Sequence, residues 1–194
     1  MTLKQLRERN RVPRVIGFDD APFHLDASPT VNFSGVVCYG TRFEGLVWKQ
    51  LARDGLDATL RLAEALLESK FHDQVQLVLI DGITLAGRNV VDLPALAGRL
   101  GRPCVAVVRR PPDMTRMRAA LEALPDFEER WSRIQRAGEV HSLEGFHFQV
   151  AAADAQDVAW ALGALTDRGK VPECLRLAHL IGSAFVTGQS SKRA

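Results

Sequence analysis

The apolar run "VQLVLI", residues 75–80, ends abruptly in Asp81 and Gly82. Such a run is typical of a strand that is buried on both faces of a parallel sheet. A carboxylate at the end of a buried strand is costly unless another group pairs with it. A shorter apolar run at residues 15–18 ends in the same way, at Asp19 and Asp20. The two runs therefore predict a sheet whose strand ends carry acids that need a partner.

The pattern around these runs predicts an α/β fold, a mixed sheet flanked by helices. Two strand patterns follow the first run, and the Tyr39-Gly40-Thr41 segment predicts a hairpin turn between them. Three antiparallel strands are therefore expected first, and parallel strands after them. The expected strands are residues 15–18, 31–40, 43–51, 75–80 and 102–109, with a strand or hairpin at 139–151. The expected helices are residues 54–69, 89–101, two within 113–137 broken at Pro125, 154–169 and 172–188.

Composition narrows the class of protein. With 194 residues, 46% of them hydrophobic, the chain predicts one domain over residues 1–194, with flexible ends at 1–12 and 188–194. A net charge of +2 neither requires nor excludes a nucleic-acid partner. No apolar run reaches the roughly 20 residues that span a membrane, and the first residues are charged. We therefore expect a cytoplasmic protein with no membrane partner, and its oligomeric state stays open.

The three cysteines, Cys38, Cys104 and Cys174, lie far apart in no metal-ligand or disulfide spacing. We interpret them as buried thiols.

The carboxylates at the strand ends predict a metal site. If the strands at 15–18 and 75–80 are parallel neighbours, Asp19 and Asp81 meet at one sheet edge. Asp57, near the start of the intervening helix, could point to the same place. Three bare carboxylates repel one another, and Mg²⁺ or Mn²⁺ would resolve the conflict. Arg109 and Arg110, at the end of the next strand, are placed to pair with a phosphate.

Each of these features also has a purely structural interpretation. An Asp-Gly pair after a strand is a common turn signal, and Asp57 could act only on the helix dipole. Arg109 and Arg110 could be a solvated strand end. The arginines within 116–136 could face nucleic acid, although a solvated helix face is favoured. Trp48, Trp131 and Trp160 could stack on a base, but core packing is favoured for them, and a metal role for His141 and His147 is disfavoured.

Five motifs, taken in order, resemble the endonuclease V superfamily, and more closely its sister group, the endonuclease dU family. They are "VIGFDDAPF", "DGLDAT", "LVLIDGITLAG" with the "NVVDL" that follows it, "GRPCVAVVRRPPD" and "VPECLRLAHLIGSA". The resemblance covers nearly the whole chain, from about residue 14 to 190. It implies a ribonuclease-H-like fold and metal-dependent cleavage of a nucleic-acid phosphodiester.

The resemblance also implies roles for individual residues. The Gly-x-Asp pattern of the first strand makes Asp19 a metal ligand, with Asp20 in reserve, and the Asp-Gly pattern does the same for Asp81. The family's basic residue resembles Arg109, with Arg110 as the alternative. The closing pattern, residues 172–179, brings His179 to the metal. The helix carboxylate, usually Glu in the superfamily, would be Asp57, with Asp54 as its rival.

Two departures from endonuclease V bear on the substrate. Its Tyr-x-Pro-Gly wedge is missing from residues 41–57, and Leu85-Ala86-Gly87-Arg88 stands where a His-Pro-Arg pattern is expected. Both departures argue against the recognition of inosine, and the resemblance to the sister group implies a deaminated base such as deoxyuridine instead. The expected function is a metal-dependent endonuclease of DNA repair, with DNA favoured over RNA. The alternatives are a nucleic-acid-binding module without turnover and a small-molecule α/β enzyme, and no glycine-rich phosphate loop supports the latter.

Overall fold

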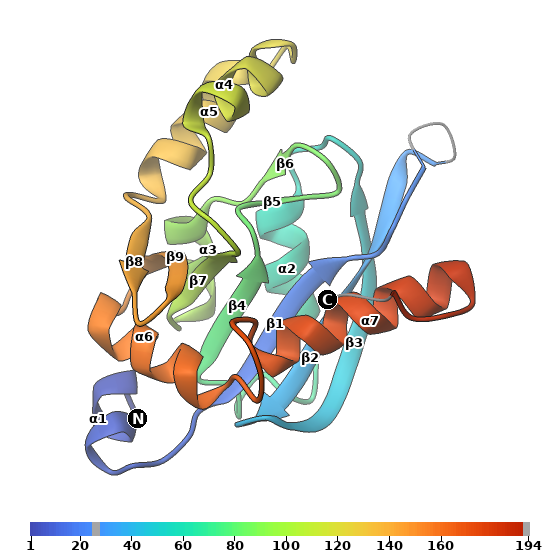
Figure 1. Ribbon diagram of the computed structural model, residues 1–194. Coiled ribbons are helices and arrows are strands. Elements are labelled where there is room, and N and C mark those ends of the chain that lie inside the picture. Colours follow the sequence, from blue (N-terminus) through green and yellow to red (C-terminus); the bar gives the residue numbers. More distant parts are fainter. Residues whose placement is uncertain (25–27, 192–194) are drawn as a thin grey trace.

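A seven-stranded mixed sheet forms the centre of the structure, a computed structural model that describes residues 1–24 and 28–191 (Figure 1). The strand order is β3-β2-β1-β4-β7-β9-β8. The strands are β1 (Arg14–Asp20), β2 (Thr30–Tyr39), β3 (Arg42–Ala52), β4 (Leu77–Asp81), β7 (Cys104–Val108), β8 (His141–Leu143) and β9 (Phe146–Ala151). The expected mixed sheet, with three antiparallel strands first in the chain, is confirmed.

The register of the three central strands determines where the site forms. β1 and β4 are parallel, with Phe18 opposite Ile80, and β4 and β7 are parallel, with Asp81 opposite Val107. β2 and β3 extend the sheet antiparallel on one side, and β9 and β8 do so on the other. The carboxyl ends of β1, β4 and β7 therefore lie together, as the acidic strand ends predicted.

The central strands carry apolar side chains on both faces of the sheet, and helices therefore cover both faces. Behind the sheet in Figure 1 lie α2 (Ala58–Leu67) and α3 (Leu93–Leu100), which share one buried cluster with Ile16, Phe18 and Ile80. In front lie α6 (Ala155–Ala164) and α7 (Glu173–Thr187), which share another with Leu79 and Val105. α7 packs directly on β1 and β2.

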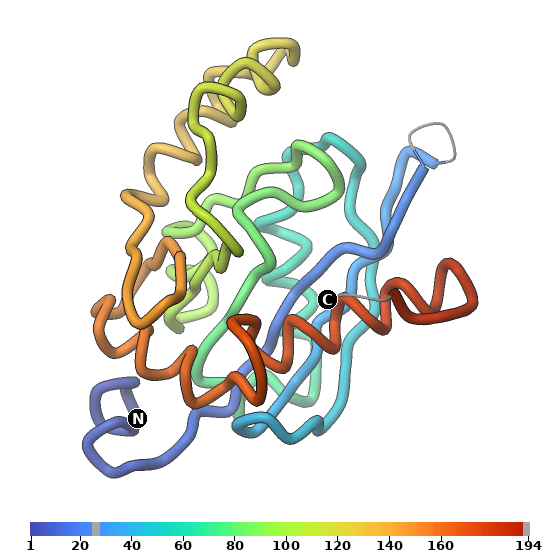
Figure 2. Tube along the Cα trace, in the orientation of Figure 1, coloured from blue at the N-terminus to red at the C-terminus, as the bar shows by residue number. Residues whose placement is uncertain are grey.

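Two helices expected around a break at Pro125 are confirmed as α4 (Met114–Glu122) and α5 (Phe127–Arg136). Figure 2 shows the chain leaving the sheet after β7, forming α4 and α5 beyond it, and returning to β8. We call residues 109–136 the α4–α5 arm. The expectation of a solvated arginine face is wrong for Arg130 and Arg133, which are 2% and 9% exposed. Their guanidinium groups bind backbone carbonyls, as described below, and this binding explains their burial.

Smaller elements refine the expectations. A hairpin of β5 (Thr84–Leu85) and β6 (Asn89–Val90) follows Asp81, where the sequence predicted no strands. The helix expected from residue 89 begins only at Leu93, because Asp92 caps it by accepting the N–H of Ala95.

The ends of the chain and the cysteines complete the fold. Residues 1–12, expected to be flexible, include α1 (Leu3–Glu8), which buries Leu3 and Leu6. Residues 192–194, part of the other expected flexible end, lie outside the described residues. All three cysteines are buried, as expected. Among the described residues, no helix combines the length and the apolar character needed to cross a membrane.

Candidate metal centre

Two carboxylates from neighbouring parallel strands form the base of the candidate site. Asp19 lies near the end of β1, and Asp81 is the last residue of β4, one position beyond the Phe18–Ile80 pair. Side chains alternate along a strand, so the in-register pairing points both carboxylates to the α7 face of the sheet. Oxygen atoms of Asp19 and Asp81 and a ring nitrogen of His179 all lie within 4.8 Å of one another.

His179 reaches the carboxylates because α7 packs unusually close to β1. A Cβ atom on Gly17 would lie 2.7 Å from the Cys174 Sγ atom, and one on Gly182 would lie 3.2 Å from the Ala21 Cα atom. Glycine is therefore needed at position 17 for the helix to approach the strand, and a larger residue at position 182 would make a tight contact. Between these two close contacts, the Nδ1 atom of His179 lies 3.0 Å from the Oδ2 atom of Asp19. The contact joins residues 160 positions apart in the chain.

Burial makes the charges of this cluster costly. Asp19 is 6% exposed, and burial, with the negative charges of Asp81 and Asp20 adding to it, raises the pKa of Asp19 to about 8. Burial also raises the pKa of Asp81, although the positive charge of Arg109 acts in the opposite direction. The pKa of Asp20 is raised as well, mainly by burial. Clustered carboxylates whose charged forms are disfavoured are typical of a site that a cation stabilises.

The cluster lies in an open hollow of about 520 Å³ at the sheet edge. Its lining residues are Asp19, Asp20, Ala21, Pro22, Phe23, Asp81, Arg109 and His179. Phe23 is a wall residue that the sequence did not single out, although it follows the two acids of β1 after only Ala21 and Pro22. A larger hollow, of about 1140 Å³, lies between α1, α3 and α6 and contains none of the clustered groups.

The structure places Asp57 away from the cluster, contrary to the expectation of three converging aspartates. Its carboxylate accepts the backbone N–H of Ala52 at 3.1 Å and a side-chain N–H of Asn89 at 2.7 Å. Arg61, one turn later in α2, pairs with it at 3.4 Å. These bonds tie the end of β3 to the start of α2 and to β6, so Asp57 has a structural role here.

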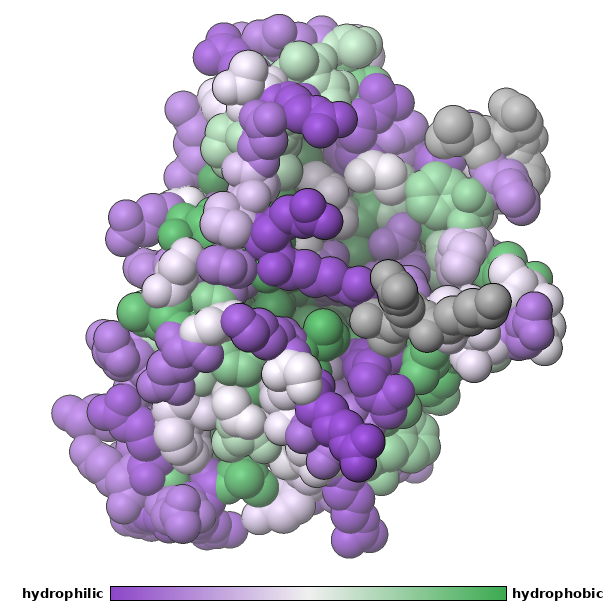
Figure 3. Space-filling view, viewed as in Figure 1, coloured by the Kyte–Doolittle hydropathy of each residue, from purple (hydrophilic) through white to green (hydrophobic). Residues whose placement is uncertain are grey.

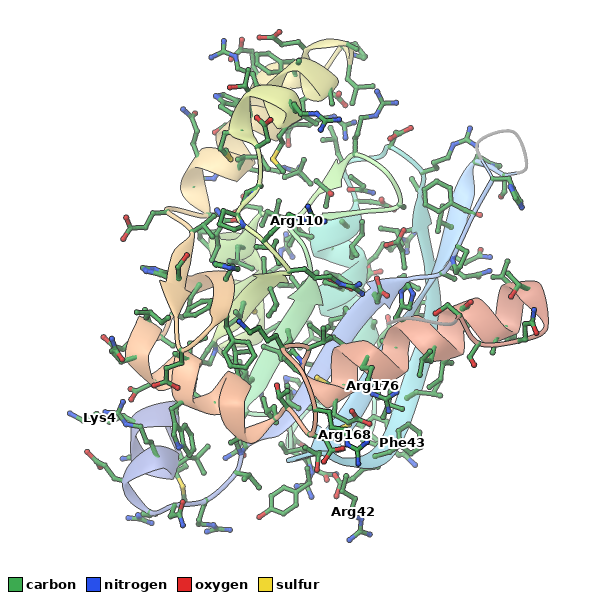
Figure 4. All side chains as sticks on the ribbon, in the orientation of Figure 1. Lys4, Arg42, Phe43, Arg110, Arg168 and Arg176 are labelled. Carbon is green, nitrogen blue, oxygen red and sulfur yellow. The ribbon has the colours of Figure 1, made fainter. Side chains whose placement is uncertain are left out.

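The residues considered as alternatives, Asp20, Asp54 and Arg110, lie at different distances from the cluster. Asp54, the rival of Asp57, pairs with the guanidinium of Arg88 at 3.0 Å, and this bond lowers its pKa. Asp20 borders the hollow, and its Oδ2 atom accepts the backbone N–H of Ala86 at 3.1 Å, which holds the β5–β6 hairpin beside β1. Arg109 lines the hollow, whereas Arg110, labelled in Figure 4, follows it at the base of the α4–α5 arm.

The sequence profile of the family described as "Endonuclease dU" matches residues 11–186. Curated relatives match over similar lengths. A UPF0215 protein of Deinococcus radiodurans is 39% identical over 182 residues, with 93% of each chain covered. A UPF0215 protein of Methanothermobacter thermautotrophicus is 37% identical over 182 residues, which cover 91% of this chain and 89% of the relative.

Solved structures share the fold. An Archaeoglobus fulgidus protein of unknown function superposes with a TM-score of 0.85 at 32% identity, over 90% of this chain and 99% of that one. Endonuclease V of Bacillus subtilis superposes with a TM-score of 0.59 at 13% identity, over 96% of this chain and 90% of the other. Endonuclease V of Ciona intestinalis was solved in complex with a 24mer DNA that contains an inosine. It superposes with a TM-score of 0.53 at 15% identity, over 91% of this chain and 90% of the other. The expected ribonuclease-H-like fold is confirmed.

Proposed function

The chain belongs to the endonuclease dU family, and from this premise we propose that it is a metal-dependent endonuclease of DNA repair. It hydrolyses a DNA phosphodiester bond near a deaminated base such as deoxyuridine. The observation that carries the proposal is the convergence of Asp19, Asp81 and His179 in one hollow beside Arg109. The family name, endonuclease dU, supports deoxyuridine as the substrate class, and the two carboxylates of the cluster fit a cation that would assist hydrolysis.

The donor atoms of the cluster fit a divalent cation. Two carboxylates offer hard oxygen ligands, which Mg²⁺ and Mn²⁺ prefer, and an imidazole nitrogen suits Mn²⁺ better than Mg²⁺. The raised pKa of Asp19, about 8, shows what the bare charges cost without a cation. Asp19 and Asp81 would hold the ion, and His179 would either complete its ligand set or fix the orientation of Asp19 through their 3.0 Å contact.

At such a site a divalent ion supplies polarisation of a phosphoryl oxygen and a lowered pKa of the attacking water. The chain's own residues supply binding and orientation. Arg109, on the rim of the hollow, can pair with a phosphate oxygen of the substrate. Phe23 gives the hollow one apolar wall.

The proposed partner is DNA. Endonuclease V of Ciona intestinalis, which shares the fold, was crystallised with DNA. The hollow in this chain is open to solvent at the sheet edge, where a nucleic-acid backbone can approach it.

Cleavage of defined oligonucleotides tests the proposal. Duplex and single-stranded DNA with one deoxyuridine, one deoxyinosine or no lesion are incubated with the protein and Mn²⁺, Mg²⁺ or a chelator. We expect metal-dependent nicking near deoxyuridine, which Asp81→Asn abolishes and Asp57→Asn retains. Asp57→Asn is the matched control, because it makes the same chemical change in an acid outside the hollow.

Two results would contradict the proposal. Tight binding of DNA without nicking in either metal would select the alternative function, a binding module without turnover. Nicking that persists in Asp81→Asn would show that the cluster does not carry the reaction.

A further inference from the structure

The arginines of the α4–α5 arm divide into those that have carboxylate or carbonyl partners and those that have none. Arg118 pairs with Glu122 and lies over the rings of Phe127 and Trp131. Arg136 pairs with Asp92 at 2.7 Å. Arg130 and Arg133 are buried. Within the described residues, the side chains of Arg109, Arg110 and Arg116 form no ion pair or hydrogen bond.

The buried arginines fix the arm to the body. The guanidinium of Arg130 donates to the carbonyls of Asp54 at 2.6 Å, Gly55 at 2.9 Å and Arg88. It also pairs at 2.6 Å with Asp126, the residue immediately before α5. Five donors in a rigid planar fork suit arginine to several acceptors at once. The arm is therefore held against the loop that precedes α2 and against the β5–β6 hairpin.

Arg133 adds a second attachment next to the first. Its guanidinium donates to the carbonyls of Leu56 at 2.9 Å and Val90 at 3.0 Å. Val90 ends β6, the strand that closes the hairpin after Asp81. Because two buried side chains tie α5 to this hairpin, the position of the arm is coupled to the segment that follows a metal-site carboxylate.

Three arginines lie close together in the chain, and the first of them is at the hollow. Arg109 lines the hollow, Arg110 is the next residue, and Arg116 lies in the first turn of α4. All three side chains are exposed. In Figure 3 the part of the molecule that contains the arm shows hydrophilic residues with apolar residues among them. The chain from Arg109 to Arg116 can span at most about 25 Å when it is fully extended. About seven base pairs of DNA have the same length.

We propose that Arg110 and Arg116 bind the phosphate backbone of the DNA that flanks the scissile bond, with the arm as a preformed rigid support. The inference rests on the proposed nuclease function and extends it to a substrate-binding surface outside the hollow. Guanidinium groups without protein partners pair readily with phosphates. A support that is already fixed loses little conformational entropy on binding. This surface would not distinguish DNA sequences, because phosphate contacts position a duplex without contacting its bases.

The salt dependence of DNA binding tests the proposal. Binding of a fluorescent duplex with one deoxyuridine is measured by anisotropy between 50 and 300 mM NaCl (roughly the range over which such slopes are resolved), with Asp81→Asn in every protein to prevent cleavage. The slope of log K against log salt is negative, and each lost phosphate contact lowers its magnitude by about 0.9. We expect this decrease for Arg110→Gln and for Arg116→Gln, and about twice the decrease for the double variant.

Arg168→Gln is the matched control. Arg168 is also an exposed arginine, and Figure 4 labels it in the loop before α7, well away from Arg110. Its loss removes the same charge and should leave the slope unchanged. Melting temperatures close to that of the parent protein establish that the variants fold.

Two outcomes would overturn the inference. If the parent protein binds DNA but its slope is the same in Arg110→Gln, Arg116→Gln and Arg168→Gln, the arm does not contact phosphates, and the nuclease proposal stands. If the parent protein does not bind DNA at all, the inference fails, and nicking by the unsubstituted protein decides whether the nuclease proposal stands.

Discussion

The Nδ1 atom of His179 lies 3.0 Å from the Oδ2 atom of Asp19, and this contact joins the closing helix α7 to the first strand of the sheet. It places an imidazole beside a buried carboxylate whose pKa is raised to about 8. The helix can approach because Gly17 leaves room for Cys174. The geometry of the candidate metal centre therefore depends on a glycine that is not itself a member of the cluster.

Gly17→Ala tests this dependence. The added Cβ atom would lie 2.7 Å from the Cys174 Sγ atom and 2.9 Å from the Cys174 carbonyl carbon, so the helix must move. We expect a loss of about 1–3 kcal/mol in the free energy of unfolding and weaker Mn²⁺ binding, measured by denaturation and calorimetry. Gly98→Ala is the control, because nothing lies within 4 Å of a Cβ at Gly98. Unchanged Mn²⁺ binding in folded Gly17→Ala would contradict the dependence.

Asp81→Asn should stabilise the metal-free protein. The substitution removes a negative charge that burial disfavours and that raises the pKa of Asp19. We expect the free energy of unfolding to rise by about 1 kcal/mol, which raises the melting temperature by about 2–4 °C in a chain of this size. Thermal melting in chelator measures the effect. A fall of several degrees would instead identify Asp81 as a required hydrogen-bond acceptor.

The stability of the metal-free protein should fall as the pH rises from about 4 to about 8. The pKa of Asp19 is about 8 in the folded protein, against an ordinary value of 3.8. Between these values the folded state keeps a proton that the unfolded state has released. The stabilisation is thus complete below the lower pKa and is lost as the pH passes the upper one. Urea unfolding at several pH values, compared with Asp19→Asn, measures the difference. Identical pH profiles would contradict the raised pKa.

Affinity for Mn²⁺ should rise with pH up to about 8 and then level off. A carboxylic acid must lose its proton before it can bind a metal ion, and the pKa of Asp19 is about 8. Calorimetric titrations in buffers of different ionisation enthalpy would show proton release on binding at pH 7 (roughly one unit below that pKa). Binding without proton release would show that Asp19 is already ionised or does not take part.

Asp57→Ala should affect stability and leave the chemistry intact. It removes the acceptor of the Ala52 and Asn89 N–H groups, which should cost about 1–3 kcal/mol. The rate of cleavage per folded molecule should stay within a few-fold of the original. Denaturation and single-turnover cleavage measure the two effects separately. Loss of cleavage in folded Asp57→Ala would return Asp57 to the active site.

Much of the fold could be predicted from the chain. The apolar runs that end in Asp19 and Asp81 predicted neighbouring parallel strands, because buried strands and sites at strand ends follow general rules for α/β sheets. The break at Pro125 and the stop at Gly101 are local signals, and both are confirmed. His179 had no such signal of its own, and only the family resemblance brought it to the cluster.

Asp57 shows why the rest could not be predicted. A carboxylate near a helix start can point to a site, cap the helix or accept bonds from a neighbouring loop, and spacing alone does not distinguish these roles. The deciding partner is Asn89, which is 32 positions away in the chain. The burial of Arg130 was not predicted for the same reason. Its carbonyl acceptors, at Gly55 and Asp54, lie 75 and 76 positions away in the chain.

The central claim is that Asp19 and Asp81 hold a divalent cation, and anomalous diffraction from a crystal grown with Mn²⁺ tests it most directly. We predict one strong anomalous peak within bonding distance of an oxygen of each carboxylate, close to the ring of His179. A protein saturated with Mn²⁺ whose peak lies elsewhere, or which shows no peak between these strands, would contradict the claim.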